Sequence, residues 1–460
     1  MKKIILSFAL MVTALCGSAQ SNPLNLASSF VECMSDDCAT KSVVDDYGLV
    51  SDGELDQSKA LQEAIYSFSK EGGGKLIIPK GTYCFANVYL ASDVHLLVEK
   101  ETVLRPYIAR PNSSSAVVML MLSGDDKSAD GYIENCSLRG LDGEFYVDYS
   151  HLPSGDVSKM RFVINRRVRN FLISDVIIKD NYTQFCAIVF TSAPEPKGAN
   201  WDVVRPTNGE IRNCSILNAN AGYGLCQFHG AQSIYLTDIY AKGGITLRLE
   251  SDSGDNAGVY DIQARNVGNE DGVSAVMMNP HGYHNGTVLV DGIWSKNSIF
   301  AVFVRRGFID AKNLHNPDAE IGTYASDSKM INIHAEFGKR GQLVNNDVWA
   351  LEPDMHKYIK AVKVDGYDGK MILGPSIAPV WNDTRDHYTV TFEGVTSTGF
   401  KHHENSVLLT EQIIDREVTR ATVTGTIKAY QDPDIVAAAK AADAKRAAKV
   451  EQYRRLQEGK

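Results

Sequence analysis

The sequence lacks the short motifs of the common nucleophilic, zinc-dependent and nucleotide-binding enzymes. It has no G-x-S-x-G elbow, no H-E-x-x-H pair, no phosphate-binding glycine loop and no catalytic Cys–His signature. Basic residues are also in deficit: 47 Lys and Arg against 56 Asp and Glu give a net charge of −9 over 460 residues. This balance argues against nucleic acid or an anionic membrane as the principal partner.

Long apolar runs are missing beyond the first residues, so no membrane span is expected in the mature chain. The start combines Met1-Lys2-Lys3, an apolar stretch and the small residues 17–19, which predicts a secretory signal peptide over residues 1–19. A lipid anchor at Cys16 is the alternative, but Leu15 is a poor residue before a lipidated cysteine. We therefore expect a secreted protein, extracellular or periplasmic, soluble and monomeric.

A short motif recurs through the middle of the chain: an apolar residue, four positions, and a second apolar residue usually preceded by Asp, Asn, Ser or Gly. Copies lie at residues 133–138, 171–176, 211–216, 234–239, 262–267 and 288–293, at intervals of 23 to 40 residues. Such a repeat indicates a solenoid with loop insertions. Because the copies are rich in β-branched residues, Gly and Asn, the pattern favours an all-β parallel β-helix over helical repeats.

The ends of the chain depart from the repeat. Residues 56–70 carry one apolar helical stripe (Leu61, Ala64, Ile65 and Phe68), which suits a cap on the open end of a solenoid. The motif weakens after Arg306 and returns at 362–367 and 390–395. We therefore expect an N-terminal segment, cap helix and first coil at 20–100, coils with the active site at 101–307, an inserted module and possible lid at 308–361, C-terminal coils at 362–430, and a helical or disordered tail at 431–460.

The run from Gly243 to Asp252 contains the main functional signal. Its apolar residues alternate with Arg248, Glu250 and Asp252, so a strand would project both carboxylates from one face, about 6.6 Å apart. Two carboxylates at such a separation can serve as acid and base on either side of a glycosidic bond. A solvated polar face without chemistry is the plainer alternative for any E-x-D.

The phase of the repeat adds neighbours to this pair. Gln227 follows Ile216 by the same 11 residues that separate Glu250 from Ile239, and His229 matches Asp252 at 13 residues. Stacked coils would then place Gln227 beneath Glu250 and His229 beneath Asp252. With the proximity of Asp252, the pKa of Glu250 is expected to be raised.

The cysteines follow the same phase. It pairs Cys186 with Cys226 and Cys136 with Cys214 at interior positions, where cysteine acts as a small apolar residue. Cys33 and Cys38 lie outside the repeat and could form a disulfide.

Arginines gather near the carboxylates: Arg248 shares their face, and Arg265, Arg305 and Arg306 lie within the next two coils. Guanidinium groups pair well with sulfate-like and carboxylate oxygens, so a local cluster could bind an anionic polysaccharide in spite of the net charge. Scattered surface arginines are the commoner explanation for any one of them.

Residues 44–85 resemble the N-terminal cap and first coil of the pectin-lyase-like superfamily, in the order D-Y-G, D-G, amphipathic helix, G-G-G and P-x-G-T-Y. This resemblance covers under a tenth of the chain. It implies a right-handed parallel β-helix that acts on polysaccharides, without choosing the substrate.

The region from Gln227 to Arg306 resembles the iota-carrageenase family of glycoside hydrolases, family 82. That family carries an acid glutamate and a base aspartate as E-x-D on one strand, matched here by Glu250 and Asp252. Its active-site glutamine one coil earlier is matched by Gln227, and its histidine one coil later by either His281 or His284, with phase favouring His281. The resemblance implies endo-acting, inverting hydrolysis of β-1,4 linkages in a sulfated galactan.

The arginine cluster and the repeat phase make Arg248, Arg265, Arg305, Arg306 and His229 candidate substrate-binding residues, and the resemblance adds His284. No cofactor is expected for the chemistry; a structural calcium or other ion could be bound. A polygalacturonase is the nearest rival, but its N-T-D, D-D, H-G and R-I-K series does not occur in that order. A pectate lyase would need a cluster of calcium-binding acids, and a non-catalytic carbohydrate-binding β-helix has no need of paired carboxylates.

Overall fold

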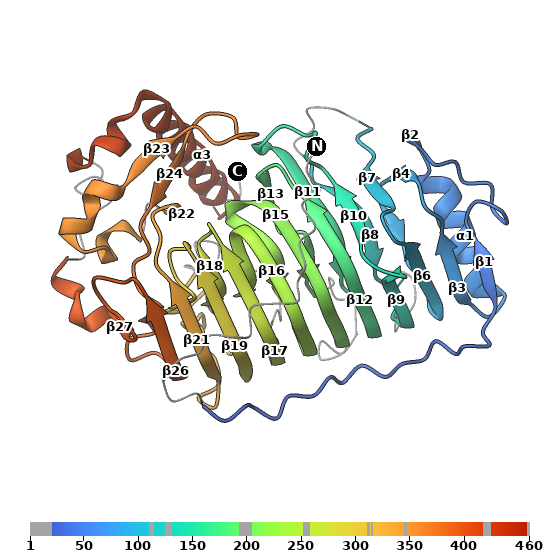
Figure 1. Cartoon of the computed structure of the whole chain (residues 1–460), viewed down its shortest axis with the longest axis horizontal. Helices are drawn as coiled ribbons and strands as arrows, with labels where there is room; N and C mark the ends of the chain where they lie inside the picture. Colours follow the sequence, from blue (N-terminus) through green and yellow to red (C-terminus); the bar gives the residue numbers. More distant parts are fainter. Residues whose placement is uncertain are drawn as a thin grey trace.

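The computed structural model describes residues 21–109, 115–124, 131–192, 205–251, 258–310, 313, 316–344, 347–416 and 425–457. Within them, 24 strands form one continuous sheet that winds into a parallel β-helix (Figure 1). The all-β fold expected from the repeat is therefore confirmed. The predicted signal peptide, residues 1–19, lies outside the described residues.

Three parallel ladders run along the β-helix. The first contains β1 (Thr40–Ser42), β3 (Gly74–Ile78), β6 (Val94–Glu99), β9 (Ile133–Leu141), β12 (Val168–Lys179), β15 (Thr207–Phe228), β16 (Ala231–Glu250), β17 (Val259–Glu270), β19 (Val288–Lys296), β21 (Lys329–Glu336) and β26 (Thr391–Thr398). The second, shorter ladder contains β2 (Asp52–Asp56), β4 (Thr82–Phe85), β7 (Val103–Pro106) and β10 (Phe145–Asp148), and continues into the later part of β12.

The third ladder carries the candidate site. It contains β5 (Val88–Tyr89), β8 (Val117–Leu122), β11 (Gly155–Asn165), β14 (Ile188–Phe190), the ends of β15 and β16, β18 (Ser274–Asn279), β20 (Val302–Arg305), β25 (Val380–Asp383) and β27 (Val407–Leu409). The short β13 (Thr183–Gln184) pairs with β11. Long strands such as β16 bend, so one strand serves both the first and the third ladder.

The remaining elements lie at the ends and on one side. They are α1 (Ser58–Lys70), a separate antiparallel sheet of β22 (Gly341–Gln342), β23 (Lys360–Val362) and β24 (Met371–Gly374), the 3₁₀ turns η3 (Val348–Ala350), η4 (Pro353–Tyr358), η5 (Thr410–Gln412), η6 (Ile414–Arg416) and η7 (Lys428–Gln431), and α3 (Pro433–Gln457). In α1 the stripe Leu61, Ala64, Ile65 and Phe68 is buried against the first coils, as predicted.

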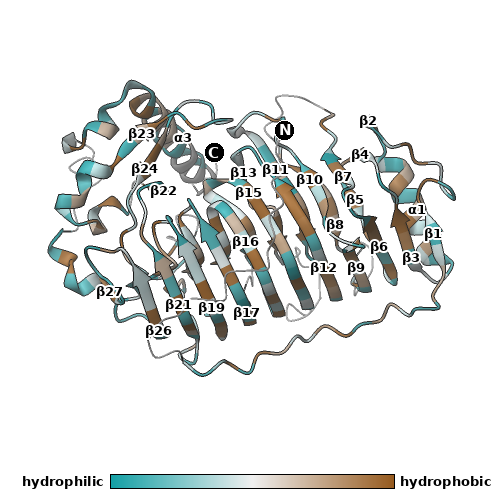
Figure 2. Ribbon diagram, viewed as in Figure 1, coloured by the Kyte–Doolittle hydropathy of each residue, from teal (hydrophilic) through white to brown (hydrophobic). Residues whose placement is uncertain are grey.

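The core is built from inward columns that repeat in each coil. One column passes from Ile173 through Ile211, Leu236 and Ala264 to Val290, and all of these are buried. Figure 2 shows the resulting alternation of apolar and polar residues along the strands. Since every coil buries the same positions, the hydrophobic gain accumulates with each added coil, as in other solenoids.

The predicted alignment of the motif copies was partly wrong. Ile211 pairs with Leu236 and Cys214 with Ile239, so the copy at 211–216 is shifted by two residues from the copy at 234–239. The copy at 133–138 is shifted by three, because Cys136 pairs with Phe171. Each coil presents inward residues at several positions, and a pattern of two apolar residues fits more than one of these registers.

The polar residue inside the motif has a structural reason. Asp175, Asn213, Asp238 and Asn266 all adopt left-handed φ values between 50° and 61°, which bend the strand at this position. Asp and Asn tolerate that conformation better than other residues with a side chain. Their side chains also stack: Asn213 donates to Asp175 at 2.9 Å, and Asn266 to Asp238 at 2.7 Å.

The buried thiols occupy different places from those expected. Cys136, Cys214 and Cys226 do lie in the interior, but Cys226 pairs with Ile188 rather than with Cys186. Cys186 belongs to a small outward cluster with Met121, Ile164 and Val189 on the third ladder. The disulfide that Cys33 and Cys38 could form is not present: both are free thiols, and the Cys33 Sγ lies 3.5 Å from the Asn135 amide oxygen.

Residues 21–38, which we call the strap, run in extended form across the first ladder (dark blue, lower edge of Figure 1). Its backbone N–H groups bond to side chains from successive coils. These bonds join Ser21 to Asn332 (3.0 Å), Leu24 to Asp291 (2.9 Å), Ala27 to Gln263 (3.0 Å) and Val31 to Asn170 (2.7 Å). Further along, Glu32 pairs with Arg139 at 2.8 Å. The strap therefore ties together coils that are far apart in sequence.

The inserted module has different boundaries from the predicted 308–361. Strand β21 lies inside that range and pairs with both β19 and β26, so it is a regular coil strand. The motif is hidden there because polar Ser328 stands where the preceding coil has Val288. Residues 360–362 form β23, which pairs antiparallel with β24 and is no coil. The described insertion, which we call the side module, spans 341–344 and 347–374.

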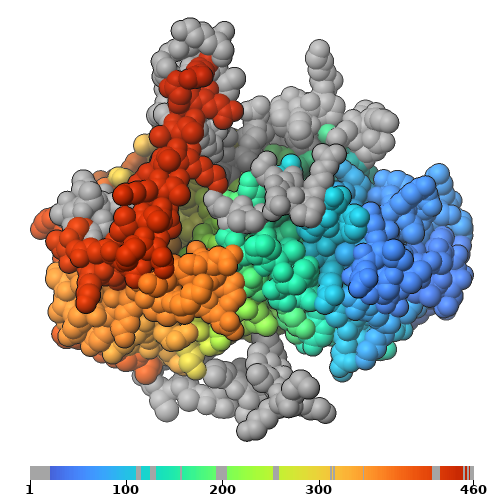
Figure 3. Space-filling view, turned by 90° about the horizontal axis from the view of Figure 1, so that it is seen from above, coloured from blue at the N-terminus to red at the C-terminus, as the bar shows by residue number. Residues whose placement is uncertain are grey.

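The side module packs firmly on the coils. Leu343, Val348, Leu351 and Met355 share one buried apolar cluster with coil residues such as Phe303. Gln342 accepts from the Gly244 N–H at 2.7 Å and donates to the Ala219 carbonyl at 3.0 Å. Seen from above, the orange module lies directly against the green coils (Figure 3). These contacts pack the side module against the coils in this structure, and its closure as a lid stays a prediction.

The tail is helical. Lys370 of the side module connects to the start of α3: its ammonium lies 2.8 Å from Asp432, just before the helix, and 3.5 Å from Asp434 in its first turn. Ile435 is buried in the same cluster as the side module, while the later turns of α3 are mostly exposed. Of the helices in the described residues, none combines the length and apolar character that crossing a bilayer requires.

Candidate active site

Glu250 ends β16 on the third ladder and projects outward from the coil, yet it is only 5% exposed. Neighbouring strands bring Asn279 beside it, since Glu250 pairs with Asn279 in register. The adjacent outward column brings Gln227 beside Arg248. The alternation of β16 thus places Arg248 and Glu250 on one face, as the sequence pattern predicted.

Four side chains contact the Glu250 carboxylate. The Arg248 Nη2 lies 2.7 Å from Oε2, and the Gln227 Nε2 donates to the same oxygen at 2.9 Å. On the other oxygen, the Asn279 Nδ2 lies at 3.3 Å and the His281 Nε2 at 3.2 Å. A buried carboxylate with this many donors is well satisfied and held in one orientation.

The observed ladder partner of Gln227 lies one outward position, or two residues, away from the predicted partner Glu250. Gln227 pairs with Arg248 rather than with Glu250, because the motif copy at 211–216 was misaligned by two residues. Its amide nevertheless reaches Glu250 diagonally, since side chains two residues apart share a face of the strand. The expected contact is present although its derivation used the wrong ladder partner.

His281 is oriented by a second carboxylate. Its Nδ1 lies 3.1 Å from Asp310 Oδ1, so the N–H at this nitrogen donates to Asp310 and Nε2 faces Glu250. The ring also lies over Phe308, with centroids 4.2 Å apart. Its backbone has a left-handed φ of 48°, an uncommon conformation that often marks positions with a special task.

The pKa of Glu250 is lowered, which contradicts the predicted rise. Burial by itself would raise it, but the positive charge of Arg248 and the hydrogen bond and charge of His281 outweigh that effect, with a further contribution from His229. Conversely, although burial would lower the pKa of Arg248, Glu250 raises it. The free protein therefore holds Glu250 as a carboxylate in an ion pair.

The other predicted residues divide into two groups. His229 is buried and close enough to influence Glu250. Arg265 belongs to the first ladder, where its Nη2 donates to the Leu24 carbonyl of the strap at 2.9 Å. Asp252 lies outside the described residues, so its place opposite Glu250 stays a prediction.

Three further candidates lie away from the carboxylate. His284 is exposed and bonds to Glu320 at 2.8 Å. Arg305 pairs with buried Asp347 beside the side module at 3.1 Å, and Arg306 is exposed on the loop after β20. Of the two histidines left open by the sequence, the structure brings His281 to Glu250.

Sequence reasoning missed Asn279, Asp310 and Tyr324. Asn279 could have been found, because it stands one coil after Glu250 in the same outward column. Asp310 carries no such signal, since it lies on a loop beyond the coil motif. The Tyr324 hydroxyl donates to the Leu249 carbonyl at 3.1 Å, and its pKa is raised by burial and by Glu250.

Comparison with known proteins identifies the family of this chain. The sequence model of the family described as rhamnogalacturonase A/epimerase, pectate lyase-like, matches residues 42–291. This chain belongs to that family. The chain is also similar to the iota-carrageenase of Zobellia galactanivorans, at 35% identity over 59% of this chain and 53% of the relative. The iota-carrageenase of Alteromonas macleodii is 33% identical over 62% of this chain and 56% of the relative.

The chain thus spans about half the length of these curated relatives in the matched segments. A solved structure named 1,3-alpha-1,4-beta-D-galactose-4-sulfate-3,6-anhydro-D-galactose-2-sulfate 4 galactohydrolase superposes with a TM-score of 0.75 at 25% identity. That match covers 85% of this chain and 95% of the other. The pectate lyase-like β-helix is therefore shown over most of the length.

Among the described residues, no group of three or more His, Cys, Asp or Glu side chains is arranged to hold a metal ion. Asp310 and Glu250 approach one another only through His281. The expectation of a bound structural ion stays a prediction.

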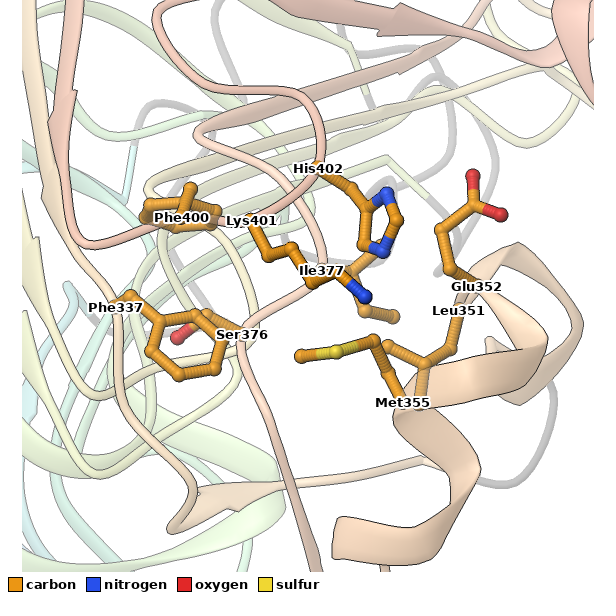
Figure 4. A pocket seen from close by; sticks show the side chains of 9 residues that line it. All are labelled: Phe337, Leu351, Glu352, Met355, Ser376, Ile377, Phe400, Lys401 and His402. Carbon is orange, nitrogen blue, oxygen red and sulfur yellow. The ribbon is translucent and has the colours of Figure 1, made fainter.

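A shallow pocket lies away from Glu250, between the side module and the last coils (Figure 4). It is lined by Phe337, Leu351, Met355, Ile377, Phe400 and His402, among others. The His402 Nε2 lies 2.9 Å from Asp354, and Lys401 pairs with the same carboxylate. The side chains of Lys401 and His402 at this pocket are thus already paired with Asp354. We therefore interpret the pocket as a packing gap beside the side module and not as part of the candidate active site.

Proposed function

We propose that this protein is an exported, endo-acting and inverting glycoside hydrolase that cleaves β-1,4 linkages of iota-carrageenan. The observation that carries the proposal is buried Glu250, held by Arg248, Gln227, Asn279 and His281 on the outer face of the β-helix. The similarity to iota-carrageenases over more than half of this chain supports the choice of iota-carrageenan, and the name of the solved galactohydrolase gives a sulfate on each sugar unit.

In the proposed mechanism Glu250 protonates the leaving oxygen and Asp252 deprotonates the attacking water. An inverting hydrolase separates two such carboxyl groups by about 6.5–9.5 Å to admit the water. Gln227 and Asn279 hold the Glu250 carboxyl in place. His281 Nε2 faces Glu250 at 3.2 Å, so one proton can be shared between the two groups before it is passed to the leaving oxygen.

The lowered pKa of Glu250 must be overcome for it to act as an acid. A sulfate ester beside Arg248 and His281 would place a negative charge next to the carboxyl and draw the two cations toward itself. Both effects raise the pKa of Glu250, since they disfavour its ionised form. By raising the pKa of Glu250, the sulfated substrate would let this carboxylate take up a proton from solvent and act as the acid, and an unsulfated galactan would not.

The test combines products with pH profiles. Purified protein is incubated with iota-, kappa- and lambda-carrageenan and with polygalacturonate, and the products are separated and their anomeric form is followed by NMR. Saturated oligosaccharides from the iota form, released with inversion, are expected. An unsaturated product would instead indicate a lyase, and binding without new reducing ends a carbohydrate-binding protein.

Glu250→Gln should reduce kcat by about 10²- to 10⁴-fold while the protein still binds the polymer. Glu270→Gln, on the first ladder of the next coil, is the matched control and should keep full activity. If substrate raises the pKa of Glu250, the alkaline limb of kcat lies at higher pH than that of kcat/KM. Coincident limbs would contradict this part of the proposal.

A further inference from the structure

A strained aromatic residue flanks the candidate active site on the N-terminal side. Phe185, just before β14, has a φ of 89°, a conformation that bulky residues essentially avoid. Such strain persists only where the surrounding contacts impose it, and it is common at binding sites. The strain presents the Phe185 ring on the outer surface of the third ladder, where it is half-buried.

Phe185 belongs to a small aromatic and cationic group. Its ring meets Tyr223 edge to face, with centroids 5.6 Å apart and planes at 81°. The Arg161 guanidinium lies over Phe185, 4.4 Å from the ring centroid. The Gln184 amide donates to the Tyr223 hydroxyl at 3.0 Å and so fixes the second ring. We call Phe185, Tyr223 and Arg161 the aromatic flank.

The aromatic flank is continuous with the catalytic carboxylate. The Arg248 guanidinium, which pairs with Glu250, lies 5.7 Å from the centroid of Tyr223. Beneath the flank, the outward cluster of Met121, Ile164, Cys186 and Val189 forms a packed apolar floor that also contacts Tyr223. Burial raises the pKa of the Cys186 thiol to about 11, and both Arg248 and Arg161 are near enough to oppose that rise.

The opposite flank differs. After Arg248 the same outward column continues as Met277, Phe303 and Trp381, and Phe303 stacks on Trp381 at 4.7 Å. The side module buries these rings in one cluster. Beside Glu250, the N-terminal flank therefore keeps a pair of aromatic rings that the side module does not cover, whereas on the opposite side the exposed Phe308 stands alone against His281.

We propose that the aromatic flank is a subsite for a sulfated sugar unit, with Phe185 and Tyr223 receiving the apolar face of the ring and Arg161 its sulfate. This inference rests on the proposed function. It specifies the surface along which the polymer extends away from the bond that is cleaved. Aromatic rings offer apolar contact to sugar C–H groups at little entropic cost, and a guanidinium pairs well with sulfate oxygens.

The test compares Phe185→Gly, Tyr223→Ala and Arg161→Gln with two controls. Glycine accepts a positive φ, so Phe185→Gly removes the ring and the strain together. Tyr223→Phe is the conservative variant: it keeps the ring and should restore most of the binding that Tyr223→Ala loses. Tyr66→Ala removes a 46% exposed aromatic on α1, remote from the site, and should change nothing.

The three flank variants should raise KM for iota-carrageenan by about tenfold, which corresponds to one lost stacking or charge contact, with kcat changed less than twofold. Arg161→Gln should also weaken the dependence of KM on salt. A KM within twofold of native for both Phe185→Gly and Tyr223→Ala overturns the subsite. If Phe185→Gly unfolds at the native temperature, its higher KM reports weaker binding. If Phe185→Gly does not fold, Tyr223→Ala and Arg161→Gln decide whether the subsite exists.

Binding is measured separately in the Glu250→Gln background, by electrophoresis through gels that contain iota-carrageenan. If the native protein releases no reducing ends, the proposed hydrolysis fails while this assay still decides the subsite. Retardation that the flank substitutions abolish supports the subsite. Retardation that they leave unchanged, or no retardation of the Glu250→Gln parent, overturns it.

Discussion

The first and third ladders are two outer faces of the same coils, and they use polar residues in opposite ways. On the first ladder, polar side chains such as Asn170 and Asn332 bond to backbone groups of the strap, and Asn170 also donates to Asn135 of the preceding coil. On the third ladder, polar groups converge on one buried carboxylate. Both faces rest on equivalent inward columns of apolar residues.

The contrast separates stability from function. Neutral amide-to-backbone bonds cost little to bury and each contributes modestly to folding. A buried ion pair such as Arg248–Glu250 is weak evidence for stability, because desolvation offsets much of its attraction. The interior columns therefore specify the solenoid, while the outer face of each ladder is free to acquire a separate task.

Among these predictions, His281→Gln should have the largest effect, and it should change activity without changing stability. It removes the group that shares a proton with Glu250, so kcat should fall by about 10²-fold or more. His284→Gln, three residues away and exposed, is the matched control and should keep native kcat. An equal fall in kcat in the two variants would show that the contact with Glu250 gives His281 no special role in activity.

A variant that begins at residue 39 and so lacks the strap should lose stability on the first ladder while its activity is kept, the opposite of the result expected for His281→Gln. The strap makes at least four backbone-to-side-chain bonds and the Glu32–Arg139 ion pair. At about 1 kcal/mol for each bond, the free energy of unfolding should drop by about 3–5 kcal/mol. It is measured by urea titration, and kcat at low temperature should be native. A drop in kcat without a drop in stability would break the comparison.

His95 makes the first ladder sensitive to acid. Burial, with the charge of Arg139, lowers the pKa of His95 to about 4, and its Nδ1 contacts Ser137 at 3.0 Å. Since the unfolded chain binds this proton more readily, the stability is fully present above about pH 6.5 and is lost as the pH falls toward 4. The loss should reach about 2–3 kcal/mol.

His95→Gln should flatten this pH dependence of the urea midpoint. His334→Gln, a half-buried histidine of the same ladder on β21, is its control and should leave the slope as it is in the native protein. A native slope in His95→Gln would assign the acid sensitivity to other groups.

Asn170→Gly should have the smallest effect. Glycine keeps the left-handed φ of 51° at this position but loses the bonds to the Val31 N–H and carbonyl. The expected loss is about 1–2 kcal/mol. Asp142→Gly, another left-handed position outside the strap contacts, should be within about 0.5 kcal/mol of native. A neutral Asn170→Gly would mean that the strap is held by its other bonds.

Sequence reasoning reached the coil architecture, the cap helix and the contact between Gln227 and Glu250. It did not reach the register, because apolar residues such as Phe171 and Ile173 both point inward and either can be taken as the start of the motif. It placed the insertion too early, because Ser328 interrupts the motif in a strand that is nevertheless a coil. Long-range partners such as Asp310 and the strap leave no periodic trace.

By itself, then, the sequence determined what repeats: which residues alternate along a strand, which Asp and Asn bend it, and that Arg248 and Glu250 share a face. Tertiary structure decided what meets across coils, because a register shift of two residues changes every neighbour while leaving the periodicity intact. It also decided the ionisation of Glu250. A pKa depends on the sum of burial and nearby charges, and Arg248, His281 and His229 reach that carboxylate from three successive coils.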